Sequence, residues 1–261
     1  MRYKKDIKFH LVNTGNRISL MWLILISVFL VFFFSLNGCF KEAVKREPLP
    51  DIVWPKAPEI PRILFVNSIS RPQDVQISKN AFNNFIRYFM GGTAVSMKSP
   101  NGITSDSEGR LYVVDTALKV VHVYDRKANR YHTFPPKKAS FTSPIDIAVD
   151  RKGRVFVTDS KEAVVKVFKK QGKKLVREIG NGIFERPTGI AVNEITGELL
   201  VVDTIASDVI KFDLNSLKFK GRIGRNGSGP GMFHYPTSIS VARNGHIIVS
   251  DALNFRVQTF T

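Results

Sequence analysis

Beyond residue 98, hydrophobic positions fall in short runs that recur about every 44 residues. The strongest runs are "RLYVVD", "RVFVTD", "ELLVVD" and "HIIVSD", and their terminal aspartates at positions 115, 159, 203 and 251 are 44, 44 and 48 residues apart. A proline, a short apolar segment and a glycine turn precede each run, and an alternating segment such as "VVHVYD" follows it. Four short strands per roughly 40–50 residues are typical of a propeller blade, so the pattern predicts an all-β fold.

The repeating units resemble NHL repeats. They lie near residues 100–143, 144–186, 187–235 and 236–261, and share the family's pattern of Pro-x-Gly-Ile-Ala-Val, a glycine turn, a Tyr-Val-Ala-Asp-like strand and Arg/Lys-Val-x-Val-Phe. The segment "GRNGSGPGMFHYP" is similar to the family's glycine-rich return. This resemblance implies an NHL-type β-propeller with six blades, of which four repeats are visible. We assign residues 62–261 to this domain.

The last unit stops at "RVQTFT", its third strand. If the ring has six blades, about two are missing, and we expect a truncated chain that forms an open arc. Such an arc would expose apolar residues of its end blade, including Ile247, Ile248 and Val249. The alternative is a closed ring of four blades, in which "RILFVNSI", residues 62–69, pairs with residues 255–260.

Two further segments precede the repeats. The spacing of Phe82, Phe85, Ile86 and Phe89 predicts a short amphipathic helix, which would cap the propeller core or face a membrane. Residues 40–61 contain five prolines and alternate charged with apolar positions. Because proline fixes φ and removes a hydrogen-bond donor, this stretch predicts an extended tether.

The N-terminal 39 residues predict a membrane signal. Residues 1–17 carry five basic side chains and one acid, and residues 18–36 carry no charge. The ending "SLNGCF" resembles the lipobox of bacterial lipoproteins, with Cys39 as the lipid attachment site, although Asn37 departs from the usual small residue. The alternative is a transmembrane helix, since 19 residues span roughly 28 Å. In both interpretations the N-terminus lies in the cytoplasm and the chain after residue 40 lies outside.

The repeated aspartates are interpreted as structural. Asp115 has equivalents at Asp159, Asp203 and Asp251, whereas an active site needs unlike groups at one place. An aspartate after a strand, followed by Thr or Ser, suits a turn in which its carboxylate accepts backbone N–H groups. The last unit departs from this pattern, because Ala252 follows its aspartate.

Candidate chemistry is otherwise sparse. The sequence predicts no catalytic residue, no metal ligand and no cofactor, because the histidines at 10, 122, 132, 234 and 246 share no ligand spacing. Ligands of propellers usually meet the central channel, and the residues after each repeat's proline should line it: Asn101, Ile145–Asp146, Thr188 and Thr237. No nucleophile–base pair is visible among them, and the ligand stays unknown.

The net charge of +17, from 39 Lys+Arg and 22 Asp+Glu, suits an anionic partner or a solvated surface. A basic cluster on the predicted rim consists of Lys166, Lys169, Lys170, Lys173, Lys174 and Arg177. It lacks the interleaved aromatic residues that base stacking needs, which disfavours nucleic acid.

We therefore expect a membrane-anchored propeller on the extracytoplasmic side of the cell envelope. Its partners would be the membrane, through the N-terminal lipid or helix, and a protein or anionic envelope polymer. It would act as a binding or scaffolding module without catalysis of its own. The alternative function is an extracytoplasmic propeller lyase or lactonase with a metal in the central channel.

Overall fold

The computed structural model describes residues 52–60, 62–75, 77, 96–135, 139–169 and 171–261. The predicted membrane segment, Cys39 and the predicted helix at 82–89 lie outside the described residues. Within the described residues, no helix is both long and apolar enough to cross a membrane. The chain divides into two compact units, Met1–Asn67 and Ser68–Thr261.

The described part of the first unit forms a short hairpin. Its strands β1 (Val53–Trp54) and β2 (Ile63–Leu64) are antiparallel, with Val53 opposite Leu64. The strand predicted at residues 62–69 is thus limited to β2, and its partner is β1. Among the described residues, Arg256–Phe260 pair with the preceding strand of their own sheet.

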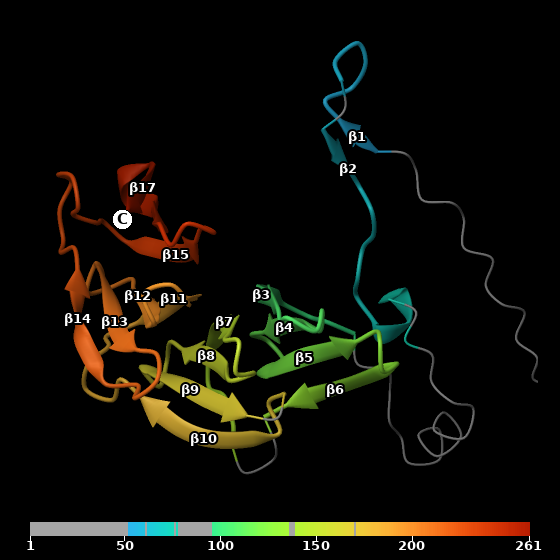
Figure 1. The fold of residues 1–261 in the computed structure, drawn as a ribbon, viewed down its shortest axis with the longest axis horizontal. Coiled ribbons are helices and arrows are strands. Elements are labelled where there is room, and N and C mark those ends of the chain that lie inside the picture. Colours follow the sequence, from blue (N-terminus) through green and yellow to red (C-terminus); the bar gives the residue numbers. More distant parts are fainter. Residues whose placement is uncertain (1–51, 61, 76, 78–95, 136–138, 170) are drawn as a thin grey trace, which may run out of the picture. The chain divides into compact units, whose positions relative to one another are not determined.

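The second unit consists of four antiparallel blades in a propeller arrangement (Figure 1). Each blade runs in chain order from an innermost to an outermost strand. The first three blades have four strands each, namely β3 (Pro100–Ser105), β4 (Leu111–Asp115), β5 (Val120–Asp125) and β6 (Arg130–Phe134); β7 (Pro144–Val149), β8 (Val155–Asp159), β9 (Val164–Lys169) and β10 (Lys174–Ile179); and β11 (Pro187–Asn193), β12 (Glu198–Asp203), β13 (Asp208–Asp213) and β14 (Phe219–Ile223). The fourth blade has three described strands, β15 (Pro236–Val241), β16 (Ile247–Asp251) and β17 (Arg256–Phe260).

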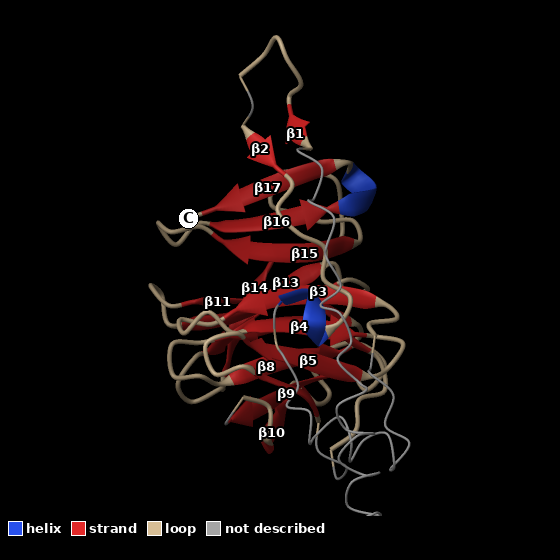
Figure 2. Ribbon diagram, turned by 90° about the vertical axis from the view of Figure 1, so that its right-hand side faces the viewer, coloured by secondary structure: helices blue, strands red, loops and turns tan. Residues whose placement is uncertain are grey.

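Strands account for nearly all the regular structure of the described residues. The described helices are two short 3₁₀ turns, η1 (Pro72–Val75) and η2 (Ala252–Asn254) (Figure 2). The predicted all-β propeller of four repeated units is therefore confirmed, with every repeat beginning its innermost strand at the predicted proline.

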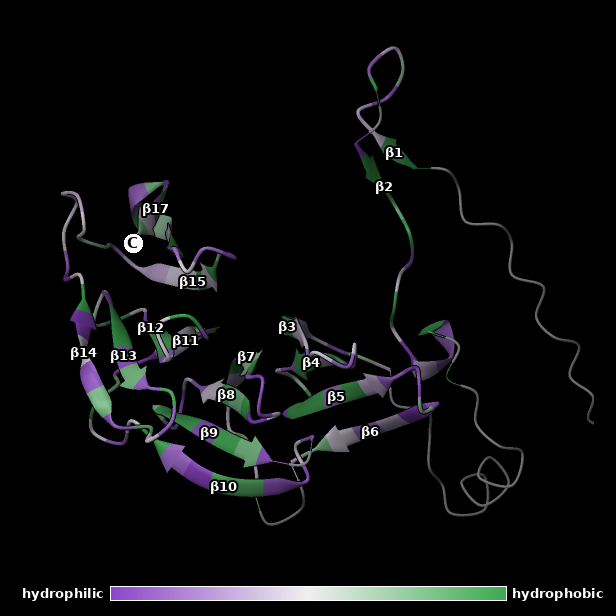
Figure 3. Ribbon diagram, in the orientation of Figure 1, coloured by the Kyte–Doolittle hydropathy of each residue, from purple (hydrophilic) through white to green (hydrophobic). Residues whose placement is uncertain are grey.

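The hydrophobic core lies between successive blades. The middle strands β5 and β9 are hydrophobic over most of their length (Figure 3), as expected of strands covered on both faces. Phe134 and Val157 belong to the cluster between the first and second blades. Phe156 and Ile210 belong to the next cluster, and Leu200 contributes to the one between the third and fourth blades. Alternate residues of one strand thus serve two interfaces.

The two end blades differ in how their outward faces are covered. The first blade packs Val113 and Tyr124 against Val75 and Ile77 of the preceding segment. In the fourth blade, Ile247 and Val249 are buried against the third blade, contrary to the expectation that they would be exposed. The exposed apolar side chains of this blade are instead Leu253, Phe255 and Val257, of which Phe255 is 93% exposed.

The four repeated aspartates connect each blade's second strand to the loop that enters the blade. Asp115 accepts hydrogen bonds from the backbone N–H groups of Lys98 and Ser99 before β3, and from Leu118 in its own turn. Burial alone would raise the pKa of Asp115, but these N–H donors lower it below its ordinary value. The structural interpretation of these aspartates is confirmed, and their bonds reach farther along the chain than a local turn.

In the first three blades, the hydroxyl residue after the aspartate joins its blade to the next one. Thr116 donates to the carbonyl of Pro144 at 2.7 Å, Ser160 to that of Pro187 at 2.6 Å, and Thr204 to that of Pro236 at 2.8 Å. These bonds hold the innermost strands of successive blades side by side. Ala252 occupies this position in the fourth blade and has no hydroxyl to donate.

Candidate functional site in the channel

The innermost strands β3, β7, β11 and β15 line an open cavity of about 700 Å³. Its polar lining comes from all four blades: Asn101, Thr104, Asp146, Arg186, Thr188, Thr237, Ser238 and Ser240. Apolar residues such as Ile147 and Ile190 fill the spaces between them. A concave site with a few convergent polar groups is the usual form of a small-molecule site.

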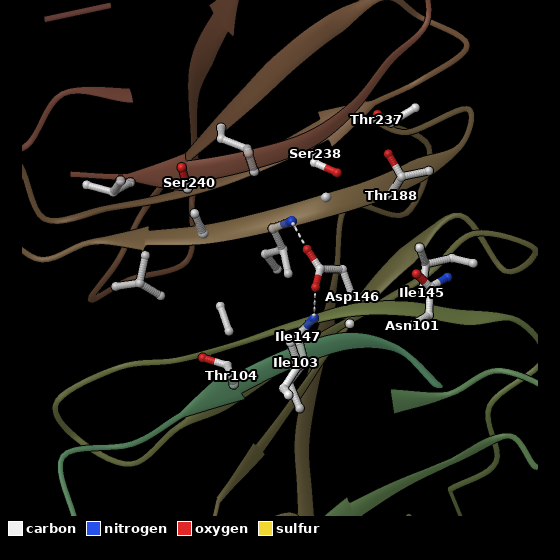
Figure 4. A pocket seen from close by; sticks show the side chains of 18 of the residues that line it. Asn101, Ile103, Thr104, Ile145, Asp146, Ile147, Thr188, Thr237, Ser238 and Ser240 are labelled. Atoms are coloured by element: carbon white, nitrogen blue, oxygen red, sulfur yellow. Dashed lines mark hydrogen bonds between the residues drawn. The ribbon is translucent and has the colours of Figure 1, made fainter. Parts of the chain in front are cut away.

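The residues predicted to line the channel all do so. Asn101, Ile145–Asp146, Thr188 and Thr237 border this cavity (Figure 4). In each blade, the register between the innermost strand and its neighbour shifts directly after the proline. A bulge of this kind redirects side chains and backbone groups out of the ladder, and here these groups lie at the channel.

Asp146 differs in chemistry from its equivalents in the other blades. The second residue after each repeat's proline is Gly102, Asp146, Gly189 or Ser238. The Oδ1 atom of Asp146 accepts the N–H of Ile147 at 2.8 Å, and Oδ2 accepts the N–H of Ile190 in the next blade at 3.0 Å (Figure 4). The carboxylate therefore bridges the second and third blades at the cavity wall.

The blades pack closely on both sides of this carboxylate. A Cβ atom added to Gly102 would lie 2.5 Å from Oδ1 of Asp146, and one added to Gly189 would lie 2.9 Å from Cα of Ser238. Contacts this short are forbidden, so glycine at both positions permits the close approach of successive innermost strands. Asp146 is consequently held in one place by its neighbours.

Burial raises the pKa of Asp146 above its ordinary value, and the N–H groups of Ile190 and Ile147 offset this only in part. Within the described residues, no basic side chain forms an ion pair with it. Arg186 also borders the cavity, but its Nη1 donates to the hydroxyl of Tyr235 at 2.7 Å. A confined carboxyl group with a shifted pKa and no cationic partner marks a candidate binding or acid–base group.

Thr158 and Thr188 support the position of Asp146. The Oγ1 of Thr158 accepts the N–H of Asp146 at 3.0 Å and donates to the carbonyl of Thr188 at 2.7 Å. Thr188 in turn shares a hydrogen bond of 2.7 Å with the hydroxyl of Thr204. This hydroxyl chain fixes the backbone on both sides of the second–third blade junction, so the carboxylate is presented from a rigid support.

None of the four described histidines lines the cavity. His122 is fully buried in the first blade, where Nδ1 lies 2.8 Å from the hydroxyl of Tyr131 and Nε2 lies 3.5 Å from Asp115. Burial lowers the pKa of His122, and Asp115 opposes that shift. His132 lies 2.9 Å from the carbonyl of Gln171. Among the described residues, no three His, Cys, Asp or Glu side chains are grouped so that they could hold a metal ion.

Sequence reasoning placed Asp146 at the channel but did not recognise its chemistry. The signal was present in the aligned repeats, where Asp146 replaces the glycine of the first and third units. The hydrogen bond to the next blade could not be read from the sequence, because it depends on the distance between two bulged strands.

Residues 139–222 and 192–260 match a protein-family model described as a 6-bladed beta-propeller. A curated relative, described as a probable peptidyl-alpha-hydroxyglycine alpha-amidating lyase of Caenorhabditis elegans, is 34% identical over 92 residues, which are 34% of this chain and 26% of that protein. The chain thus spans about a quarter of the relative's length.

Two solved structures show the same fold. A gluconolactonase of Xanthomonas campestris superposes with a TM-score of 0.50 at 19% identity, covering 62% of this chain and 58% of that one. An auxiliary nutrient binding protein of Bacteroides thetaiotaomicron superposes with a TM-score of 0.51 at 12% identity, covering 66% and 51%. The fold is therefore shared by proteins named as enzymes and as binding proteins, and only the site can distinguish these functions.

Proposed function

We propose that this chain is a membrane-anchored, extracytoplasmic binding module whose propeller channel holds a small polar ligand at Asp146. The channel offers one carboxylate and several hydroxyl groups, which together accept hydrogen bonds from ligand N–H or O–H groups. The surrounding isoleucines exclude water from the less polar part of a ligand. Amines and polyhydroxylated molecules are the chemical classes that fit this lining.

The asymmetry of Asp146 is the observation that carries the proposal. Residues that build the ring recur in every blade, as the aspartates at 115, 159, 203 and 251 do. Asp146 occurs in one blade, at a position where the first and third blades have glycine. A group that the repeat does not require, and that faces a cavity, is best explained by a ligand.

A thermal-shift screen of the full chain with monosaccharides, aldonolactones and primary amines tests this function. A ligand of the channel should raise the melting temperature of the wild type, and Asp146→Gly should bind it at least about tenfold more weakly, since a hydrogen bond to a charged group contributes roughly 1.5–3 kcal/mol. Thr133→Ala, on the exposed outermost strand β6, is the control and should bind normally. Equal binding by the wild type and Asp146→Gly would show that the ligand does not contact Asp146.

Catalysis in the channel is a second candidate, and the raised pKa of Asp146 is the observation that favours it. A carboxyl group whose pKa is raised holds its proton to a higher pH, which suits a general acid. The fold is shared with proteins named as a lyase and as a gluconolactonase, so lactone and lyase substrates belong in the screen. Asp146→Asn separates the two functions: a binding site would lose affinity, whereas a catalytic site would bind substrate and cease to convert it.

The pH dependence of stability provides an independent test of the environment of Asp146. Because its pKa is raised on folding, the stability linked to its protonated form is fully present below the ordinary aspartate pKa and is lost as pH rises through the folded value. We expect Asp146→Asn to gain stability relative to wild type as pH is raised from about 3 to about 7. Urea titrations at several pH values measure this difference, and a gap that is constant with pH would contradict it.

Anchoring through Cys39 is part of the same proposal. Its support is the charge-free stretch at 18–36 and the lipobox-like "SLNGCF". Mass spectrometry of the membrane form should show loss of residues 1–38 and acyl chains on Cys39 in the wild type, and an uncleaved chain in Cys39→Ala. An intact N-terminus in both would favour the transmembrane helix. Accessibility of the propeller to protease added outside intact cells tests the extracytoplasmic location.

A further inference from the structure

The hairpin between β9 and β10 carries a pair of like charges where the neighbouring blades carry opposite ones. In the first blade, Asp125 lies opposite Arg130, and their Oδ2 and Nη2 atoms are 3.1 Å apart. In the second blade, Lys169 lies opposite Lys174. Like charges directly across a ladder are destabilising. The second blade therefore departs from the stabilising arrangement at this hairpin.

The third blade also supplies an acid at this position. Asp213 follows the same strand pattern, and its backbone N–H donates to the carbonyl of Lys218 at the hairpin end. The aligned third strands thus end in Asp125, Lys169 and Asp213. Of these three blades, only the second has a base in place of the acid. The repeat pattern therefore does not account for the positive charge at this hairpin.

The basic cluster predicted on the rim separates in the structure, and its arginine, Arg177, is exposed and donates to the carbonyl of Ser216 at 3.2 Å. Lys166 is buried, contrary to its expected place on the rim: its Nζ lies 2.6 Å from Glu162 and donates to the carbonyl of Ser140 at 2.6 Å. Lys169, Lys173 and Lys174 are exposed and form no ion pair among the described residues. Lys170 lies outside the described residues. The exposed group is called the lysine hairpin below and consists of Lys169, Lys173 and Lys174.

The lysine hairpin is held firmly against the first blade. Gly172 at its tip is buried, and its backbone touches the ring of Phe134 so closely that an added Cβ would lie 2.0 Å from Cδ1. The carbonyl of Gln171 lies 2.9 Å from Nε2 of His132 on β6. Gln171 and Gly172, directly before Lys173, are therefore fixed against the first blade.

We infer that the lysine hairpin docks on an anionic phospholipid surface. Three exposed, unpaired ammonium groups on one turn are complementary to such a surface, and the repulsion between Lys169 and Lys174 is relieved when phosphate groups lie between them. Val176, which is 45% exposed on the same strand, adds an apolar contact. Because the partner is a membrane, this inference rests on the proposed anchoring. The 28 residues from 40 to 67 can span at most roughly 100 Å, which limits the distance between the propeller and its bilayer.

Lysine acetylation in reconstituted vesicles tests the inference. The full chain is placed in phosphatidylcholine vesicles or in vesicles containing phosphatidylglycerol, and a water-soluble acetylating reagent is applied before mass spectrometry. We expect the three lysines of the hairpin to react about threefold or more slowly on the anionic vesicles. This protection should disappear at about 1 M salt, where the Debye length is roughly 3 Å. Lys218, at the matching hairpin of the third blade, serves as the internal control and should react equally on both.

Lys169→Asp restores the opposite charges of the neighbouring blades. It should raise the melting temperature, because it replaces a repulsive pair by an attractive one, and should abolish the lipid protection of Lys173 and Lys174. If the hairpin binds no lipid, Lys169→Asp should still raise the melting temperature, but the wild type would show no protection of its lysines on anionic vesicles. Lys218→Asp is the matched control and should leave the protection of the lysine hairpin unchanged.

The outcomes separate this inference from the anchoring on which it rests. Flotation of the chain with both vesicle types, together with equal acetylation on both, would overturn the docking surface and leave the anchor intact. Failure to float with either type would overturn both. Protection by soluble polyphosphate on neutral vesicles, without protection by phosphatidylglycerol, would also overturn the lipid surface, in favour of a soluble polyanion.

Discussion

Replacing Asp203 by alanine is expected to lower the free energy of unfolding by about 3–5 kcal/mol. The side chain is fully buried, and its two oxygens accept four backbone N–H groups, from Glu185 at 2.6 Å, Arg186 at 3.0 Å, Ala206 at 3.1 Å and Ile205 at 3.2 Å. A buried donor left without an acceptor costs about 1–3 kcal/mol, and some of these four reach water after the substitution. Urea unfolding of the wild type and variant measures the loss.

Two variants calibrate this result. Asp203→Asn keeps one acceptor oxygen but places an amide NH₂ group against an N–H donor. Its loss of unfolding free energy should therefore be smaller than that of Asp203→Ala. Ile205→Ala changes an exposed side chain in the same turn and should alter stability by no more than about 0.5 kcal/mol. A loss for Asp203→Ala similar to that of Ile205→Ala would show that the aspartate does not join the entering loop to the blade.

The repeated features of the chain were predictable because each occurs several times. The prolines, glycine turns and terminal aspartates defined four units, and the structure places a blade at each of them. Periodicity also placed Asn101, Thr188 and Thr237 at the channel. A repeat aligns its members in space as well as in sequence, so one correct assignment fixed the others.

Interactions between blades were beyond sequence reasoning. The bonds from Thr116, Ser160 and Thr204 to the prolines of the next blade explain why a hydroxyl residue follows the aspartate, but the pattern alone suggested a local turn. Lys166 was assigned to the exposed basic cluster because its neighbours in sequence are basic. Its burial between Glu162 and the carbonyl of Ser140 results from packing against the loop that enters the second blade.

The most informative positions are those where one blade departs from the others. Asp146 replaces a glycine at the channel, and Lys169 replaces an aspartate at the rim. Both substitutions bring an unfavourable term, burial of a carboxylate in one case and repulsion of two lysines in the other. Both lie in the second blade, and neither residue type occurs at the matching position of the first or third blade. Local costs that the fold does not require are typical of binding sites, which supports the proposed ligand and lipid contacts at these positions.

Replacing Gly172 by alanine is expected to cost about 2–5 kcal/mol of folding free energy. Gly172 has φ +85°, and its added Cβ would lie 2.0 Å from Cδ1 of the buried Phe134 ring. The left-handed conformation costs a non-glycine residue about 1–2 kcal/mol, and displacement of the packed ring costs about 1–3 kcal/mol more. Because this contact seats the lysine hairpin on the first blade, the substitution should also loosen the hairpin.

Gly109→Ala separates the two contributions to this cost. Gly109 has a similar φ of +78°, and no atom lies within 4 Å of its added Cβ, so only the conformational cost of about 1–2 kcal/mol should appear. In a Phe134→Leu background, where the ring is removed, Gly172→Ala should cost no more than Gly109→Ala does in the wild type. A double-mutant cycle measured by chemical denaturation isolates this coupling. Additive costs for Gly172→Ala and Phe134→Leu would show that the hairpin tip is not seated on the Phe134 ring.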